Sequence, residues 1–486
     1  MRLLTFQDLK KRNDLQLTLL AVLATTVYLI IWSIVQHPIT PLYLLLLMVL
    51  FVAIIQYPKI GVYLMIFGSF VFINAFSLHP LYLGGVEIKL YLVDFIIGFT
   101  VLSIVWRLLN KRFTLKEHLP RWTPVETVVS FFVALVLITF VRSLFLPASI
   151  FDLNFSTLKN YGLYAVVYIL VMLLFKEKHK REELMSVVFY SGIVVLGIAI
   201  AGIIRGEGFW AALTPLSTFG SRFVAMGHTF FTVIFSLLLS GLWFVRKRIT
   251  MRSWVLLSLF LVCIVVFFVG LVRHLWVAVA ALGVIWFIYL QRPVFKDILK
   301  LMFGACGILL VSGFFVYTFF VSYGLETRGF DRVQYALEER FDVSKWFQSG
   351  TDTSVGYRYA LWSTAYSMFF KQPVFGIGFG RWLPANDAGY LFEAPVRQVH
   401  NFYIAVALQM GFVGAVVVAL WLVLLAKSAL RDRAKEFNLI RFWSESSMIL
   451  FLLSSFFATY WELNVYIVVW WIFLALWRLE GGGERV

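Results

Sequence analysis

The sequence has little charge and few long polar stretches. Only 14% of its 486 residues are Asp, Glu, Lys or Arg, whereas 61% are hydrophobic. A soluble domain is about one quarter charged and about half apolar. A chain this apolar cannot cover its surface with polar side chains. The composition therefore excludes an ordinary soluble protein and predicts a lipid bilayer as the solvent.

Cysteine is scarce, and patterns typical of a signal peptide or a metal site are missing. Cys263 and Cys306 both lie in apolar segments, so we interpret them as small core residues and expect no disulfide. The first apolar run, 15–35, is too long for a signal-peptide core and lacks a clear A-x-A site, so it is predicted to remain as a membrane anchor. The longest polar segment, 323–400, contains no D-x-D cluster and no His/Asp group with metal spacing. We therefore expect no metal ion and no other cofactor.

Apolar runs of about 20 residues recur along the whole chain, and each is long enough to cross ~30 Å of hydrocarbon. The predicted fold class is all-α: a polytopic helical membrane protein with about 12–14 transmembrane helices and one long outer loop that contains short helices. The predicted spans lie near 15–36, 41–57, 60–78, 88–109, 125–146, 160–175, 184–204, 223–245, 253–271, 274–290, 298–322, 401–426, 443–460 and 463–479.

The basic residues indicate the orientation of these spans. Lys and Arg gather in short clusters between apolar runs, so the net charge of +16 is a topology signal and does not indicate nucleic acid. With the N-terminus in the cytoplasm, 28 of the 42 Lys and Arg fall in loops on the cytoplasmic side. Both termini are then cytoplasmic. The chain divides into an N-terminal transmembrane bundle (1–322), an outer loop (323–400) and C-terminal transmembrane helices (401–486).

The outer loop, 323–400, is longer than a connection needs to be, and such loops are usually functional or disordered. Aromatic residues and apolar side chains at helical spacing over 357–368 predict an amphipathic helix instead of disorder. The glycines of GIGFG at 376–380 end it. Because no βαβ unit surrounds these glycines, we expect a flexible turn packed closely against the bundle, not a dinucleotide loop. A role near a ligand stays open.

Three arginines at the edges of apolar segments are candidate site residues: Arg222, Arg273 and Arg358. An ionisable group at the edge of the hydrocarbon is costly unless it is paired. The alternative is an interfacial arginine that extends to water. Guanidinium groups bind phosphate oxygens through two hydrogen bonds and stay charged, so the predicted ligand is an anion such as phosphate. Asp94 and Arg142 could instead form a structural ion pair at the same side.

His400 lies at the border between the outer loop and the apolar run that follows it. Its unperturbed pKa of ~6.5 is close to the value that a general base needs near neutral pH. The alternative is an interfacial or helix-capping histidine.

The stretch RYALWSTAYSMFFKQPVFGIGFGRW, followed by VHNFYIAVALQMGFVGAVV, resembles the signature region of the O-antigen ligase and polymerase family. Its pattern is R-x-x-x-W, then P-x-x-G-x-G-x-G, then H-N and a glycine-punctuated helix. FGSRFVAMGHTF and FFVGLVRHLWVAVAAL are similar to two upstream segments of the family, so the resemblance covers roughly 215–480. Two places depart from it: Val272-Arg273-His274 replaces Ser-Arg-small, and Gln409 replaces an acidic residue.

The resemblance implies a GT-C-like glycosyltransferase that moves a glycan from an undecaprenyl-pyrophosphate donor to an acceptor hydroxyl, without a metal. His400 would be the general base. Arg358, Arg273 and, with a weaker match, Arg222 would hold the pyrophosphate. The acceptor would be lipid A-core of lipopolysaccharide or another cell-envelope glycan. The expected location is the bacterial inner membrane, with the site facing the periplasm and membrane lipids around the helices.

Several functions stay open at this point. A ligase transfers a finished chain, whereas a polymerase extends chains repeat by repeat, and we favour the ligase. A flippase or transporter of the same lipid-linked glycan is less favoured, because no internal repeat is found and the candidate residues gather on the outer side. A sensor or scaffold would leave the grouping of histidine and arginines unexplained.

Overall fold

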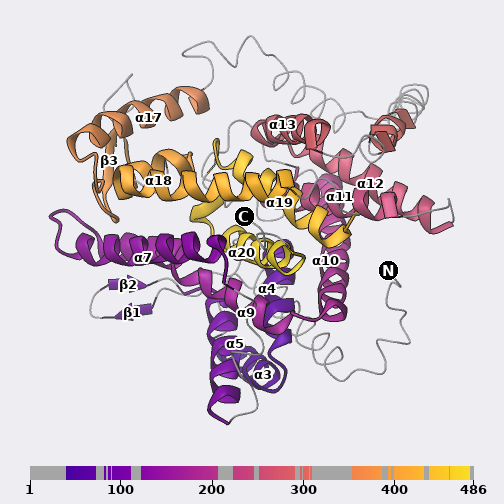
Figure 1. The fold of residues 1–486 in the computed structure, drawn as a ribbon, viewed down its shortest axis with the longest axis horizontal. Coiled ribbons are helices and arrows are strands. Elements are labelled where there is room, and N and C mark those ends of the chain that lie inside the picture. The colour runs from indigo at the N-terminus through magenta and orange to yellow at the C-terminus, as the bar shows by residue number, and fades with distance from the viewer. Residues whose placement is uncertain are drawn as a thin grey trace.

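The structure is a computed structural model. It describes residues 40–72, 81–83, 86–88, 90–110, 122–205, 223–245, 251–289, 296–297, 299–305, 307–308, 353–385, 392–395, 399–431, 437–458 and 460–481. Most of these residues are helical, and six of the described helical segments are long and apolar enough to cross a membrane. The predicted fold class, a polytopic helical membrane protein, is therefore confirmed (Figure 1).

The helices follow the predicted spans closely. In the first part of the chain they are α3 (Thr40–Gln56), α4 (Lys59–Val71), α5 (Leu92–Leu109), α7 (Pro124–Leu144), α8 (Phe151–Tyr161), η2 (Leu163–Ala165), α9 (Val166–Leu174), α10 (Lys178–Arg205), α11 (Met226–Val245), α12 (Met251–Val269) and α13 (Arg273–Tyr289). Then come α17 (Thr353–Lys371), α18 (Phe402–Arg431), α19 (Leu439–Ser454), η6 (Tyr460–Glu462) and α20 (Asn464–Leu479). The predicted span 15–36 lies outside the described residues, as does most of 298–322.

Two local predictions need correction. Helix α8 occupies the segment that we had assigned to an outer connection before the predicted span 160–175. Its sequence, FDLNFSTLKNY, is too polar for a hydropathy signal, but Gly162 and η2 join it to α9 as one broken segment over Phe151–Leu174. Four short strands also form two antiparallel hairpins: β1 (Leu81–Leu83) with β2 (Val86–Ile88), and β3 (Trp382–Ala385) with β4 (Phe392–Pro395).

Helix α20 lies at the centre of the bundle (Figure 1). Every residue from Val465 to Arg478 is buried, and the helix packs against α4, α9 and α19. A helix that is apolar all round is stable only when neighbours or lipid cover every face. The short predicted span at the end of the chain is therefore the core helix around which the others pack.

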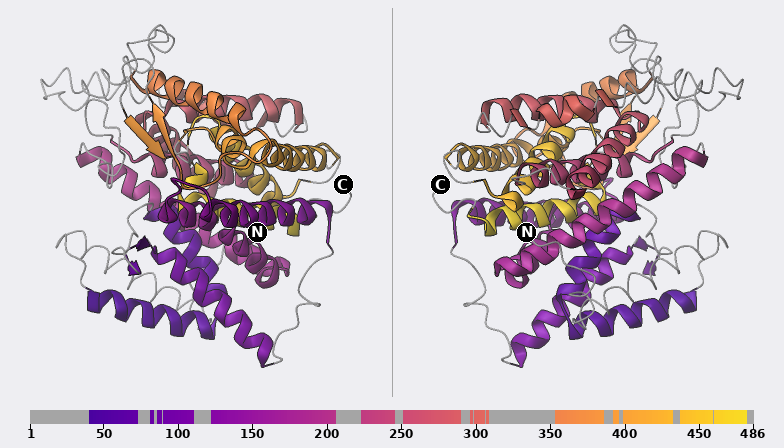
Figure 2. Two further views of the ribbon diagram at one scale, coloured as in Figure 1. Left: turned by 90° about the vertical axis from the view of Figure 1, so that its left-hand side faces the viewer. Right: turned by 90° about the vertical axis from the view of Figure 1, so that its right-hand side faces the viewer.

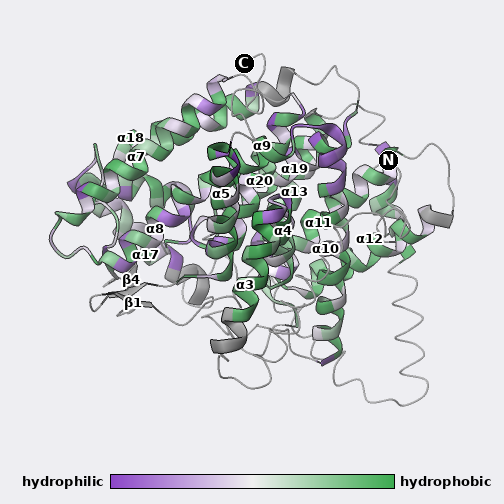
Figure 3. Cartoon of the chain, turned by 90° about the horizontal axis from the view of Figure 1, so that it is seen from below, coloured by the Kyte–Doolittle hydropathy of each residue, from purple (hydrophilic) through white to green (hydrophobic). Residues whose placement is uncertain are grey.

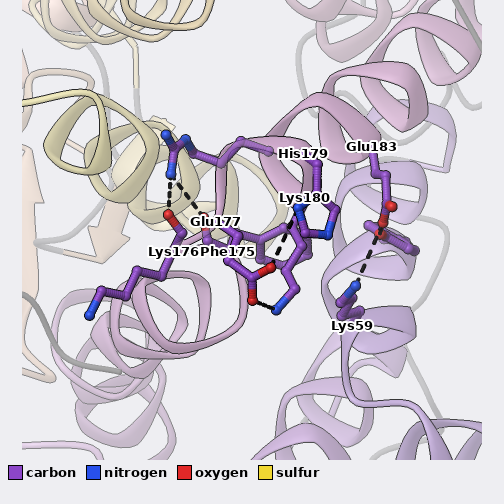
Figure 4. A network of polar contacts seen from close by, with 9 residues as sticks. Lys59, Phe175, Lys176, Glu177, His179, Lys180 and Glu183 are labelled. Carbon is purple, nitrogen blue, oxygen red and sulfur yellow. Dashed lines mark hydrogen bonds and ion pairs between the residues drawn. The ribbon is translucent and has the colours of Figure 1, made fainter. Parts of the chain in front are cut away.

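Ion pairs join several helices at one end of the bundle. The topology predicted from the Lys and Arg distribution assigns this end to the cytoplasmic side. Figure 4 shows one of them, between Lys59 at the start of α4 and Glu183 of α10. Such pairs are costly to separate when they are buried, so they fix the helix ends to one another. The pairs are Arg478–Glu126 at 2.8 Å, Arg181–Glu480 at 2.6 Å and Lys59–Glu183 at 3.6 Å.

The helix termini at the opposite end are those that the predicted topology assigns to the outer side. His228 Nε2, near the start of α11, lies 2.9 Å from the carbonyl oxygen of Val71 at the end of α4. Both hairpins lie at the lower left of Figure 3. Figure 2 shows the indigo α3 and the orange α17 at opposite edges of the molecule.

Candidate active site

Helix α17, the amphipathic helix predicted in the outer loop, carries Arg358. The helix packs on α18 through Leu361 and Ala365, whose side chains are buried, whereas Tyr359 and Tyr366 on its other face are exposed. The buried residues form a small apolar cluster, separate from the core of the bundle, in which α17, the glycine segment and α18 meet. This cluster attaches the outer loop to the start of α18.

The same contact brings Arg358 close to His400. Trp362 lies one helical turn after Arg358, and its indole N–H donates to the carbonyl oxygen of Val399 at 2.8 Å. Val399 directly precedes His400, and the charge of Arg358 acts on the imidazole. Two of the residues predicted from the sequence, Arg358 and His400, are therefore neighbours, although they lie 42 positions apart in the sequence (400 − 358).

The backbone explains why a histidine and an asparagine follow one another here. Asn401 is the N-cap of α18, because its Oδ1 accepts hydrogen bonds from the N–H groups of Tyr403 at 3.0 Å and Ile404 at 3.1 Å. His400 itself has φ = 55°, in the left-handed region that few non-glycine residues adopt. Backbone strain of this kind clusters at functional sites. The capping role that the sequence left open for His400 thus belongs to Asn401.

The surroundings of His400 keep its imidazole neutral. Burial, and secondarily the positive charge of Arg358, lower the pKa of His400 to about 4. Both causes disfavour the protonated form. At neutral pH the ring therefore has one nitrogen that can accept a proton, as a general base requires.

Arg273 is the first residue of α13, at the same end of the bundle. The next residue, His274, has its Nε2 2.9 Å from the hydroxyl oxygen of Tyr460 in η6. Since η6 joins the end of α19 to the start of α20, this contact ties Arg273 to the end of the core at which α20 begins. Arg222, the third candidate arginine, lies outside the described residues.

The GIGFG segment, 376–380, docks on α18 at a kink. The N–H groups of Ile377 and Gly378 donate to the carbonyl oxygens of Leu408 at 2.8 Å and Gln409 at 3.1 Å. Gly376 has φ = 65°, and a Cβ there would lie 2.5 Å from the backbone of Gln409. Only glycine allows this approach. The predicted close packing of this turn against the bundle is confirmed.

Arg142 holds the other side of the same turn. From the last turn of α7, its guanidinium donates to the carbonyl oxygens of Phe375, at 2.5 Å, and Gly376. The N–H of Phe379 in turn donates to Ser143 Oγ at 2.7 Å. The turn is thus fixed between α7 and α18.

The structural ion pair that the sequence left open between Asp94 and Arg142 is not formed. Asp94 instead binds Lys159 Nζ at 2.8 Å and accepts a hydrogen bond from Tyr164. Arg142 binds carbonyl groups, as a basic side chain at the C-terminus of a helix often does. Charge counting had put Asp94 and Arg142 on one side of the membrane, but it gives no information about which side chains meet.

Sequence reasoning included Trp362 and Asn401 in the family motif but assigned neither a role, and it missed the η6 residues. Asn401 had a visible signal, because an asparagine directly before an apolar run is a typical N-cap. The contacts of Trp362 and Tyr460 join distant segments and leave no local signal. Cys263 is buried in α12, as predicted, and Cys306 lies outside the described residues. Among the residues described here, no group of three or more His, Cys, Asp or Glu side chains could hold a metal ion.

Comparison with known proteins finds a family match within the chain. None of the curated proteins matches the chain. The model of one protein family, described as O-antigen ligase, matches residues 259–419. This segment includes Arg273, Arg358 and His400. The match confirms, over residues 259–419, the resemblance to the O-antigen ligase family that the sequence motifs predict.

Proposed function

We propose that this membrane protein transfers a glycan from an undecaprenyl-pyrophosphate donor to an acceptor hydroxyl, with His400 as the general base. The observation that carries the proposal is the neutral imidazole of His400 beside the guanidinium of Arg358, where the outer loop docks on α18. A base and a fixed cation at one place suit a reaction that removes a proton from the acceptor while negative charge develops on a leaving group.

In the proposed step, the acceptor oxygen attacks the anomeric carbon of the donor glycan and gives its proton to His400. The bond between that carbon and the pyrophosphate oxygen breaks, and the electron pair leaves with the undecaprenyl pyrophosphate. Arg358 and Arg273, with Arg222 as a third cation, bind the pyrophosphate oxygens. Cations placed in advance stabilise the charge that develops on the leaving group, without the cost of moving them during the reaction.

Because Arg358 and His400 lie close together, binding of the donor is also expected to change the pKa of His400. Arg358 lowers the pKa of His400 in the free protein. A bound pyrophosphate would bring negative charge close to both groups and offset part of this effect. The basicity of His400 would then rise when the donor is bound, at the stage at which the acceptor loses its proton.

We further propose that the protein lies in the bacterial inner membrane with both termini in the cytoplasm and the site facing the periplasm. The distribution of Lys and Arg supports this orientation, and so does the gathering of the site residues at one end of the bundle. The partners would be the lipid-linked glycan donor, membrane lipids, and lipid A-core or another glycan as acceptor.

The decisive experiment is glycan transfer by the purified protein in lipid nanodiscs. A lipid-linked glycan is supplied as donor, and lipid A-core and free repeat units are offered separately as acceptors. Transfer of one whole chain to lipid A-core supports the ligase, whereas a ladder of repeat lengths without lipid A-core identifies a polymerase. Transfer is expected to survive exhaustive EDTA treatment. Movement of the lipid across the bilayer without any transfer would overturn the proposal.

Two variants test the assigned roles. His400→Ala is expected to abolish transfer while expression and membrane insertion stay normal, and near-normal transfer by this variant would remove His400 as the base. Arg358→Lys keeps the charge but loses the second hydrogen bond to a phosphate, so transfer is expected to fall by about tenfold or more. A fully active Lys variant would indicate that Arg358 only balances charge.

A further inference from the structure

The one-turn helix η6 lies outside the segment that matches the family, yet it contacts both candidate site elements. Tyr460 is fully buried, and its ring packs against those of Phe230 and Tyr466, each 4.7 Å away between centroids. The hydroxyl of Tyr460 points to His274 Nε2, 2.9 Å away. Leaving a buried hydroxyl without its hydrogen bond is costly, so this bond fixes the start of α13. Arg273 is the residue next to His274.

The following residue, Trp461, contacts the other element. Its indole is buried and stacks on the ring of Phe402, with centroids 4.2 Å apart and an interplanar angle of 13°. Phe402 is two positions after His400, and its N–H donates to the carbonyl oxygen of Ser455 at 2.9 Å. The stacked rings and this hydrogen bond hold the start of α18 against the end of α19.

The third residue, Glu462, anchors the turn itself. Its Oε1 accepts a hydrogen bond from the Tyr161 hydroxyl at 2.5 Å, and its carbonyl oxygen accepts one from Asn160 Nδ2 at 2.8 Å. Both donors belong to the end of α8, the polar helix that hydropathy missed. The η6 turn is therefore held by α13, α18 and α8, and a shift at one of these contacts would displace the other two.

We propose that η6 is a positioning element that sets the place of Arg273 relative to His400, through the Tyr460–His274 and Trp461–Phe402 contacts. This inference rests on the proposed function. The physical reason is that Arg273 must hold the pyrophosphate of the donor while His400 meets the acceptor hydroxyl that attacks the adjoining anomeric carbon, and a misplacement of ~1 Å costs about a hundredfold in rate. Position 274 is also one of the two places where the sequence departs from the family pattern that it resembles.

The test uses Tyr460→Phe, which removes the hydroxyl but keeps the ring and its packing. In the full-length protein in nanodiscs, undecaprenyl pyrophosphate is expected to bind about tenfold more weakly than to the wild type, and the KM for the donor to rise by a similar factor. The thermal unfolding midpoint is expected to stay within about 2 °C of the wild type. His274→Ala is expected to give the same loss, and the double variant no further loss. His274→Gln, which can still pair with the hydroxyl, is expected to restore part of the binding.

Tyr63→Phe is the matched control, since it removes one tyrosine hydrogen bond, to Glu183 at 3.0 Å, at the opposite end of the bundle. If Tyr460→Phe binds undecaprenyl pyrophosphate like the wild type, the positioning role is wrong. It is also wrong if Tyr460→Phe and Tyr63→Phe lose stability and binding to the same extent, because the loss of binding then follows from the loss of stability. If the wild type binds no undecaprenyl pyrophosphate and Arg273→Ala changes nothing, the proposed function fails and this inference with it. A third outcome overturns the positioning role alone: the wild type binds normally and Arg273→Ala weakens the binding, but Tyr460→Phe leaves it unchanged.

Discussion

The indole N–H of Trp362 and the carbonyl oxygen of Val399 lie 2.8 Å apart in a hydrogen bond that joins α17 to the start of α18. Arg358 is one helical turn before Trp362, and His400 is the next residue after Val399. This one bond therefore holds the cation and the imidazole close to each other. The closeness has a measurable consequence, because Arg358 contributes to the low pKa of His400.

The rate of glycan transfer should depend on pH in a way that reports the pKa of His400. A general base must be neutral, and the folded protein lowers the pKa of His400 to about 4, from an ordinary value of ~6.5. We expect kcat/KM to stay level as the pH falls from 7.5 to about 5 and to fall only as the pH approaches the pKa. Half-maximal kcat/KM near pH 6.5 would contradict the low pKa. Donor binding measured over the same range separates an effect on the donor from an effect on the base.

Trp362→Phe should change this pH dependence. The variant keeps an aromatic ring but loses the N–H that binds Val399, so Arg358 is no longer held beside His400. We expect kcat/KM at neutral pH to fall by about tenfold. We also expect the acidic fall in rate to begin at a higher pH, because one cause of the low pKa is weakened while burial remains.

Trp382→Phe is the control for this variant, since Trp382 is partly exposed on β3. Its pH profile should match that of the wild type. An unchanged profile in Trp362→Phe would show that other contacts hold Arg358, and the role of this hydrogen bond would be wrong.

Much of the fold could be predicted because the bilayer imposes simple rules on the sequence. A helix must be apolar over about 20 residues to cross the hydrocarbon, so hydropathy alone located most of the described helices. Helix α8 escaped this rule because several of its polar side chains find partners inside the protein: Asn160, for example, donates to the carbonyl oxygen of Glu462. The hairpins and η6 are too short to leave a periodic pattern.

The candidate site was predictable only in part. The motif around His400 named the histidine and Arg358, but their closeness depends on the contact between Trp362 and Val399, which no local pattern shows. The sequence left the pairing of Asp94 open for the same reason. Topology predicts the side of the membrane on which a side chain lies, but packing decides which side chains meet, and Asp94 meets Lys159 of α8.

Gly376→Ala should distort the turn that connects α17 to the bundle. The added Cβ would lie 2.5 Å from the backbone of Leu408 and Gln409, at a residue with φ = 65°. The left-handed backbone costs ~1 kcal/mol for alanine, and the overlap adds about 1–3 kcal/mol. We expect a lower thermal unfolding midpoint and a lower rate of transfer, because the turn carries α17 and Arg358 with it.

Gly98→Ala provides the comparison for this variant. Gly98 lies within α5, and a Cβ there would meet no atom within 4 Å. Alanine has the higher helix propensity, so this variant should be as stable as the wild type or slightly more stable. If Gly376→Ala behaved like Gly98→Ala in both assays, the close approach of the turn to α18 would not matter for the site.

The orientation of the bundle can be tested with two positions at opposite ends of α7. Phe145 follows the helix and is 82% exposed, whereas Trp122 precedes it and is 69% exposed. The bias of Lys and Arg assigns Phe145 to the outer side and Trp122 to the cytoplasm. In a chain whose two native cysteines are replaced by alanine, Phe145→Cys should react with a membrane-impermeant maleimide in intact spheroplasts. Trp122→Cys should react only after the membrane is opened, and the reverse pattern would place the candidate site in the cytoplasm, where an outward-facing donor cannot reach it.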